Sequence, residues 1–207
     1  MDPHLWLAFV LASVALLLIP GPTNFLILGH AMRQGRAGAL AMVAGITLGD
    51  GLAMTASLAG LGALIAASAT AFTVLKTVGA LYLVYLGVQL WRSGGAALQA
   101  TGDIAARPGK RVFRDGLMVT MLNPKSIAFF VAFVPQFVDP QAAVMPQFAL
   151  LVATFVTLAG INALAWALAA SQMRARLARP RVIAGLTRLG GAALVGMGLM
   201  TATLRRA

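Results

Sequence analysis

The chain has 207 residues, of which 60% are hydrophobic and 10% are charged, and its mean hydropathy is +0.88. Soluble domains carry about 25% charged residues, so this composition indicates an integral membrane protein. With about 20 apolar residues needed for each helical span, the length allows roughly five to seven spans in one all-α domain, 1–207, and no soluble second domain. The net charge is +11, but the basic residues lie between the hydrophobic runs and do not form the basic face of a soluble domain. This distribution argues against nucleic acid as a partner.

Hydropathy predicts six membrane-spanning helices, the first of them a retained helix and not a signal peptide, because no Lys or Arg precedes its apolar run. A five-span chain with its N-terminus inside is the alternative, because the first run is interrupted. The six predicted spans are approximately Leu5–Leu28, Ala39–Ile65, Phe72–Trp91, Gly116–Val138, Phe148–Ala170 and Ile183–Leu204.

Prolines interrupt the first and the fourth of these spans. Pro20-Gly21-Pro22 breaks the first, and Asn123-Pro124-Lys125 breaks the fourth. A proline inside an intact helix costs about 3 kcal/mol, so both spans are expected to be broken helices. Paired interruptions at corresponding places in two halves are the best sequence indication of a transporter's central site.

The connections between the spans alternate in charge. The connections after spans one, three and five are basic, whereas the N-terminus and the segments 66–71 and 139–147 hold no Lys or Arg. By the positive-inside rule the basic connections are cytoplasmic, which places both termini outside. The basic residues are Arg33, Arg36, Arg92, Arg107, Lys110, Arg111, Arg114, Arg174, Arg176, Arg179 and Arg181.

The two halves of the sequence resemble each other, with repeat one at about 1–93, a cytoplasmic linker at about 94–115 and repeat two at about 116–207. When spans three and six are aligned, five pairs of residues coincide: Leu75 with Leu186, Gly79 with Gly190, Leu83 with Leu194, Val84 with Val195, and Gly87 with Gly198. Three spans in each half require the second repeat to be inverted in the membrane. The small residues also favour close helix packing and permit a homodimer.

Asp50 is the only acidic residue inside a predicted span. A carboxylate at the centre of a membrane helix costs roughly 2.5–3.5 kcal/mol, so it is expected to face the protein interior or water and to have a function. It could bind the ammonium group of a substrate, or it could take up and release the proton that drives transport. A structural ion pair with Lys125 is the alternative.

Several polar residues near the breaks are candidates for the same site. A half-helix that begins at Pro124 would present positive potential, to which Lys125 adds, and a substrate carboxylate would bind there. Alternatively, Lys125 reaches the cytoplasmic interface and serves only as an anchor. Thr23 and Asn24 follow the first break and offer further hydrogen-bonding groups. Asn162 either lines the same cavity or forms an interhelical hydrogen bond.

Motifs in a fixed order carry a family resemblance: Pro20-Gly21-Pro22, the basic segment 33–38, Gly45-Ile46-Thr47-Leu48-Gly49-Asp50, the segment 82–87, Asn123-Pro124-Lys125, Phe129-Phe130 and Pro135-Gln136-Phe137. With these motifs, nearly the whole chain resembles the LysE/RhtB family of amino-acid exporters. The resemblance implies a bacterial inner-membrane carrier of about six helices that expels amino acids or close derivatives in exchange for protons. The family often has Asn directly after Pro-Gly-Pro, whereas here Thr23 precedes Asn24.

Together, these features predict a secondary active exporter, surrounded by membrane lipids, that works by alternating access at a midplane site and is not an enzyme. Asp50 would couple substrate export to protons, and no cofactor is expected. A neutral or hydrophilic amino acid is favoured, because a dibasic one would lack a second carboxylate partner. The predicted substrate-binding residues are Pro20, Gly21, Pro22, Thr23, Asn24, Asp50, Asn123, Pro124, Lys125 and Asn162.

Three other functions remain as alternatives. A carrier of metal ions would need several buried carboxylates, His or Cys, whereas this chain has one buried Asp, no Cys and two His. A membrane enzyme would need a nucleophile with a base or an acid pair, and the sequence shows no such motif around His4, near the terminus, or His30, at the first connection. A protein that handles lipid or another small solute would explain the spans, but it would not explain two breaks beside polar residues.

Overall fold

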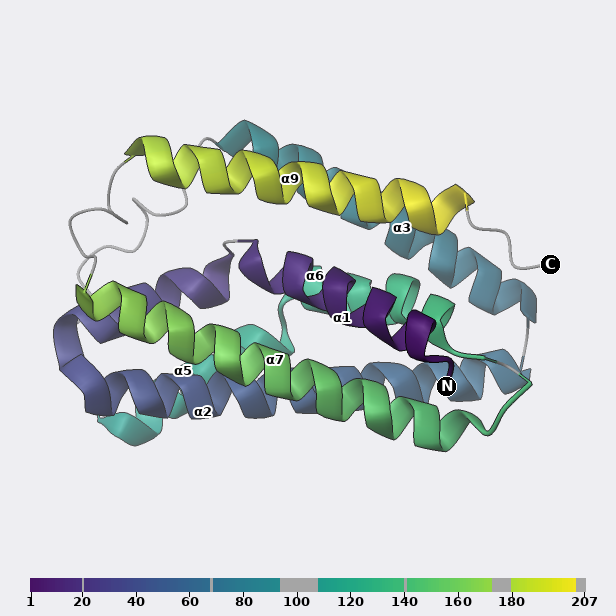
Figure 1. The fold of residues 1–207 in the computed structure, drawn as a ribbon, viewed down its shortest axis with the longest axis horizontal. Coiled ribbons are helices and arrows are strands. Elements are labelled where there is room, and N and C mark those ends of the chain that lie inside the picture. Colours follow the sequence, from purple (N-terminus) through teal and green to yellow (C-terminus); the bar gives the residue numbers. More distant parts are fainter. Residues whose placement is uncertain (20, 68, 94–107, 140, 173–179, 204–207) are drawn as a thin grey trace.

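The structure is a computed structural model, and it describes residues 1–19, 21–67, 69–93, 108–139, 141–172 and 180–203. These residues form helices and no strand, as the sequence predicts, and the helices lie along one another in an elongated bundle (Figure 1). Most of the predicted linker, and Pro20 of the predicted site, lie outside the described residues. The elements are α1 Pro3–Leu18, α2 Pro22–Ala67, α3 Ala69–Ser93, α5 Gly109–Met121, α6 Pro124–Ala128, the π-helix η1 Phe129–Phe133, the 3₁₀-helix η2 Val134–Phe137, α7 Val144–Gln172 and α9 Pro180–Thr203.

Six apolar stretches of these helices follow the order of the six predicted spans. Three are long and apolar enough to cross a membrane: Gly38–Gly62, Gly109–Phe137 and Val144–Ala169. Three shorter apolar stretches are Pro3–Leu18, Thr73–Gln89 and Arg188–Ala202. A lipid environment requires every backbone polar group to be satisfied inside the protein, which helices achieve. The all-α, polytopic architecture therefore agrees with the sequence analysis.

Both predicted helix breaks are present. α1 ends at Leu18, Ile19 has an extended backbone with ψ of 116°, and α2 begins at Pro22. α5 ends at Met121, and α6 begins at Pro124. At each break a proline stands at the first helical position, where its missing N–H costs nothing because that group would have no partner within the helix.

The helices extend further into the basic connections than predicted. α2 is 46 residues long and includes the segment 33–36, where a loop was expected, and it folds back so that its two parts run in opposite directions (Figure 1). α5 begins at Gly109, before the predicted start at Gly116. The reason is that Arg, Lys, Gln and Ala are good helix formers, so a loss of hydrophobicity does not end a helix.

The antiparallel pair α3 and α9 shows the relation between the two repeats. A Cβ atom added to Gly87 would lie 2.7 Å from the Val195 side chain, and one added to Gly198 would lie 2.6 Å from the Val84 side chain. The sequence alignment pairs Gly87 with Gly198 and Val84 with Val195, so the two contacts are equivalent. Reciprocal contacts between antiparallel, equivalent helices indicate a two-fold axis across the bundle, as inverted repeats require.

The same two helices also contact the broken spans. A Cβ on Gly79 of α3 would lie 2.7 Å from Cβ of Ala132, in the broken fourth span. A Cβ on Gly190 of α9 would lie 2.6 Å from the side chain of Ile19, at the break of the first span. α3 therefore packs against the broken fourth span, and α9 packs against the break of the first span.

Candidate functional site

The two helix breaks are joined by hydrogen bonds. The Asn123 side chain accepts a hydrogen bond from the backbone N–H of Lys125 at 3.1 Å and so caps α6. Its amide nitrogen donates to the hydroxyl oxygen of Thr23, in the first turn of α2, at 3.4 Å. Both side chains are buried. Asn123 therefore closes one helix break and holds it against the other.

Lys125 makes a second connection between the breaks. Its ammonium group donates to the backbone carbonyl oxygens of Leu16 and Ile19, each at 3.1 Å. Carbonyls at the end of a helix have no partner within the helix and carry partial negative charge, so a cation is stabilised there. An ammonium group has three N–H donors, and two of them are used in this way. The charged end of Lys125 thus lies at the centre of the site, and not towards a basic connection.

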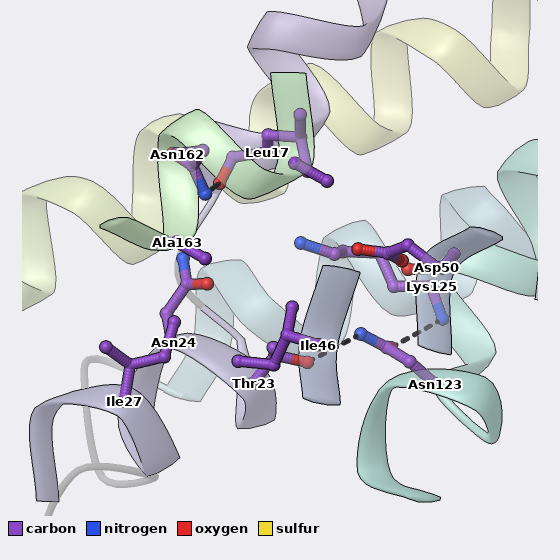
Figure 2. Close-up of a pocket in the computed structure, with 12 residues that line it drawn as sticks. Leu17, Thr23, Asn24, Ile27, Ile46, Asp50, Asn123, Lys125, Asn162 and Ala163 are labelled. Atoms are coloured by element: carbon purple, nitrogen blue, oxygen red, sulfur yellow. Dashed lines mark hydrogen bonds between the residues drawn. The ribbon is translucent and has the colours of Figure 1, made fainter. Parts of the chain in front are cut away.

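A polar cavity of about 20 Å³ lies between the breaks. That volume is enough for a water molecule. Figure 2 shows Thr23, Asp50, Asn123 and Lys125 around it. The Asp50 side chain is 4% exposed, and the positive charge of Lys125 attracts its carboxylate. The cavity therefore combines an anionic and a cationic group within an apolar bundle.

Two amides lie around the same cavity and bind the end of α1. Asn24 donates to the carbonyl oxygen of Ile19 at 3.4 Å, and Asn162 of α7 donates to the carbonyl oxygen of Leu17 at 3.2 Å. Asn162 thus lines the cavity and also forms an interhelical hydrogen bond. From the sequence alone, these two roles were alternatives. With Lys125, these amides satisfy the carbonyl groups that the break in α1 exposes.

The structure brings most of the predicted site residues together. Thr23, Asn24, Asp50, Asn123, Lys125 and Asn162 line the cavity. Gly21 is buried, and its Cβ position is 3.7 Å from the Lys125 ammonium nitrogen. Pro22 and Pro124 begin helices, and the Pro124 side chain is exposed and does not line the cavity. Both prolines therefore shape the site by starting a helix at each break.

Other lining residues were not predicted from the sequence. Ser126 is buried and lines the cavity; its position next to Lys125, in the first turn of the half-helix, was a signal that could have identified it. The remaining lining residues are apolar and offer no such signal. They are Leu17, Ile27, Ile46, Ala159 and Ala163.

A larger cavity of about 780 Å³ lies between α2 and α7, but its chemistry differs. It is lined by apolar residues and by Thr55, whose hydroxyl is its hydrogen-bonding side chain. A site for a polar solute needs converging polar groups, so the smaller cavity is the better candidate despite its size. In the described part of the chain, no group of three or more His, Cys, Asp or Glu side chains could hold a metal ion.

Comparison with known proteins gives the same family along the chain. The model of the LysE type translocator family matches residues 14–204. An uncharacterised membrane protein of Vibrio cholerae is 35% identical over 99% of this chain and 100% of its own length. A homoserine/homoserine lactone efflux protein of Salmonella typhimurium is 32% identical over 98% of both chains. A leucine efflux protein of Klebsiella pneumoniae is 30% identical over 66% of this chain and 65% of its own length. No solved structure matches the chain.

The family match covers both helix breaks, Asp50 and the last span, so it includes every described residue that lines the polar cavity. The chain therefore belongs to the LysE type translocator family.

Proposed function

We propose that this protein is a secondary carrier that exports amino acids or close derivatives across the bacterial inner membrane in exchange for protons. The observation that carries the proposal is the polar cavity between two interlocked helix breaks, with the carboxylate of Asp50 and the ammonium group of Lys125 around it. An amino acid has one cationic and one anionic end. A site with one group of each sign is complementary to it.

The relatives support an amino acid with an uncharged side chain. One is named for the efflux of homoserine and its lactone, and another for the efflux of leucine. The lining supports the same class, because Asp50 is the one acidic side chain among the described residues that line the cavity, and a dibasic substrate would need a second carboxylate. We therefore propose neutral amino acids as the substrate class.

We assign opposite ends of the substrate to Asp50 and Lys125. The Asp50 carboxylate would bind the substrate ammonium group. The substrate carboxylate would take the N–H of Lys125 that is not donated to Leu16 or Ile19. Ser126 and Asn162, which also line the cavity, would supply hydrogen bonds for the side chain of the substrate.

Asp50 is also the proposed site of proton coupling. Of the five acidic residues in the sequence, it is the one inside a predicted span. A carboxyl group that has taken up a proton no longer attracts an ammonium group, so proton uptake from outside would release the substrate there. Loss of the proton to the cytoplasm would restore the carboxylate for the next substrate. This order of events couples inward proton movement to outward substrate movement.

The cavity of about 20 Å³ is too small for an amino acid, so the site must widen for transport. Movement of the two inverted repeats against each other would open it to one side at a time. We propose the orientation of the positive-inside rule, with the basic connections in the cytoplasm and both termini outside. The small-residue helix faces leave room for a homodimer as the assembled form.

Efflux from cells fed with dipeptides tests the proposal. Cells that express the wild type should release more of one or a few neutral amino acids than cells without the protein. Asp50→Asn should reduce this release by at least about tenfold, because the loss of a buried charge partner costs more than 1.4 kcal/mol.

Asp139→Asn is the matched control, because Asp139 lies between η2 and α7 and its side chain accepts a hydrogen bond from the backbone of Gln141, which Asn can also do. It should export like the wild type. Wild-type protein that is folded in the membrane yet raises the release of no amino acid would contradict the proposed function. Equal release by Asp50→Asn would contradict the role of Asp50.

A further inference from the structure

Most of the described buried apolar residues fall into two clusters, and both clusters contribute residues to the lining of the polar cavity. After the proposed orientation, we call the cluster on the side of the segment 138–143 the outer cluster and the cluster on the side of the basic connections the inner cluster. The outer cluster contains seven phenylalanines: Phe9, Phe129, Phe130, Phe133, Phe137, Phe148 and Phe155. The inner cluster consists of smaller side chains: Ile27, Ala31, Ala39, Met42, Ile46, Val112, Ala163 and Ala167. Ile27, Ile46 and Ala163 line the cavity as well, so the inner cluster directly adjoins it.

A pair of rings covers the cavity on the side of the outer cluster. Phe130 lies one helical turn beyond Ser126, and Phe155 lies one turn before Ala159; Ser126 and Ala159 both line the cavity. In both cases the turn leads towards the segment 138–143, which joins η2 to α7. Both rings are fully buried and meet edge to face, with centroids 4.9 Å apart. The ring pair therefore lies between the lining residues Ser126 and Ala159 and that connection.

The ring contacts continue from this pair across the outer part of the molecule. Phe129 has ring centroids 6.0 Å from Phe155 and 5.3 Å from Phe133. Phe137 is 5.3 Å from Phe133 and 5.5 Å from Phe9 of α1. These contacts join α7, the broken fourth span and α1. The rings of the outer cluster therefore connect three of the elements that must separate if the cavity is to open outwards.

The segment that carries four of these rings has irregular helical geometry. η1, from Phe129 to Phe133, is a π-helix, and η2, from Val134 to Phe137, is a 3₁₀-helix that contains Pro135. Changes between α, π and 3₁₀ geometry shift a helix by small changes in hydrogen bonding, and such segments often mark hinges and functional sites. The rings therefore stand on a part of the fourth span that can rearrange locally.

The inner side of the cavity is closed by smaller groups. Ala31, Met42 and Ala167 lie one helical turn beyond the lining residues Ile27, Ile46 and Ala163. In each case the turn leads towards a basic connection of the sequence. Met is flexible and Ala is small, so this closure needs less side-chain movement to open than the ring pair does.

From these contacts we propose that Phe130 and Phe155 form the outer gate of the transport path and that Met42 with its alanine neighbours forms the inner gate. The proposal rests on the proposed function, because it assigns a path to a transported solute. In the present conformation both gates are closed around the cavity.

A buried hydroxyl is found at the level of the outer gate: Ser13, one turn from Leu17, has no hydrogen-bond partner among the described residues. A buried hydroxyl without a hydrogen bond is unfavourable, and a polar solute that passes the gate would provide a partner for it.

Thiol labelling tests the gates, because the sequence has no cysteine. Ser126→Cys places one thiol in the cavity, and Gln141→Cys places one in the exposed connection beyond the outer cluster as a reference for that side. A charged, membrane-impermeant methanethiosulfonate is applied to intact cells and to inside-out vesicles. Labelling of the denatured protein shows that the thiol is reactive, and a monodisperse elution profile in detergent shows that the variant is folded.

The Ser126→Cys thiol should react slowly from both sides. Phe130→Ala should raise the labelling rate of the Ser126→Cys thiol about tenfold from the side that labels Gln141→Cys. The reason is that loss of the ring increases the population of the conformation in which the outer gate is open. Met42→Ala should raise the labelling rate from the opposite side. Tyr85→Ala, which removes an exposed ring of α3 outside both clusters, should change neither rate. Phe155→Leu, a milder change, should act like Phe130→Ala and provides a second folded variant.

Unchanged labelling in folded Phe130→Ala or Phe155→Leu would overturn the outer gate. Labelling from the Gln141 side in Met42→Ala would overturn the inner one. The readout needs no transport of amino acids. A protein that exports none of them would refute the proposed function, while the labelling rates would still decide whether these residues close the cavity.

Discussion

Lys125 connects the two helix breaks and also interacts with the charge of Asp50. It donates to the end of α1 from a position 106 residues after Ile19, and its charge attracts the Asp50 carboxylate. Removing one partner of a buried charge pair costs about 3–5 kcal/mol, because the other charge stays buried without compensation. The stability of the protein and the electrostatics of the site therefore depend on the same side chain.

Thermal unfolding in detergent can test this dual role. Lys125→Met should lower the melting temperature clearly, because it leaves Asp50 uncompensated and removes the donor of two backbone carbonyl groups. The double variant Lys125→Met/Asp50→Asn should recover part of the loss, since it removes the uncompensated charge. Lys110→Met, at an exposed position near the start of α5, is the control and should unfold like the wild type. Strictly additive effects of Lys125→Met and Asp50→Asn would refute the coupling.

At the scale of single residues, the sequence identifies those site residues whose polarity contrasts with the apolar span around them. Asp50, Thr23 and Asn162 stand out from apolar spans, and all of them line the cavity. Ile46 and Ala163 also line it, but an apolar side chain in a membrane span has no distinguishing mark. The partners of Lys125 were unpredictable for a different reason: they are backbone carbonyl groups, which every residue has.

At the scale of elements, glycines determine how closely α3 and α9 approach. A Cβ on Gly198 would lie 2.7 Å from the backbone oxygen of Ala80 and 2.6 Å from the Val84 side chain. Helix association in lipid depends on such packing of small residues, so an added methyl group would force the helices apart.

Two alanine substitutions on the same helix test this packing. Gly198→Ala should destabilise the protein by about 1–3 kcal/mol, the usual cost of overpacking. Gly196→Ala should be neutral or slightly stabilising, because no atom lies within 4 Å of its Cβ position and alanine has the higher helix propensity. The comparison uses thermal unfolding of the two purified variants. Equal melting temperatures for them would refute close packing at Gly198.

The sequence predicts the breaks at this scale but not the helix types beyond them. A proline inside an apolar run interrupts the helix, so the breaks at Pro22 and Pro124 could be predicted. The π-helix from Phe129 to Phe133 could not, because it depends on packing of phenylalanines from distant elements, among them Phe155 of α7. The helical backbone of the segment 33–36 was missed because charge was taken to indicate a loop.

At the scale of the whole molecule, the internal repeat unites these features. The matching residues of spans three and six and the paired proline breaks predicted two inverted halves, and the reciprocal contacts of Gly87 and Gly198 agree with that prediction. The two-fold relation places one broken span of each half at the centre and the polar cavity between them. The closed state of that cavity depends on side-chain packing and was not predictable from spacing. In the proposed function, the two halves move against each other, and the polar groups beside the helix breaks bind the substrate.

Exchange of a labelled neutral amino acid across proteoliposomes, without any imposed pH gradient, tests the central claim most directly. Exchange needs binding and reorientation of the site but no net proton flow, so it isolates the role of Asp50 in binding. The wild type and Asp139→Asn should exchange the amino acid, and Asp50→Asn should slow exchange by at least about tenfold. Exchange at the wild-type rate by a folded Asp50→Asn protein would contradict the assignment of the substrate site.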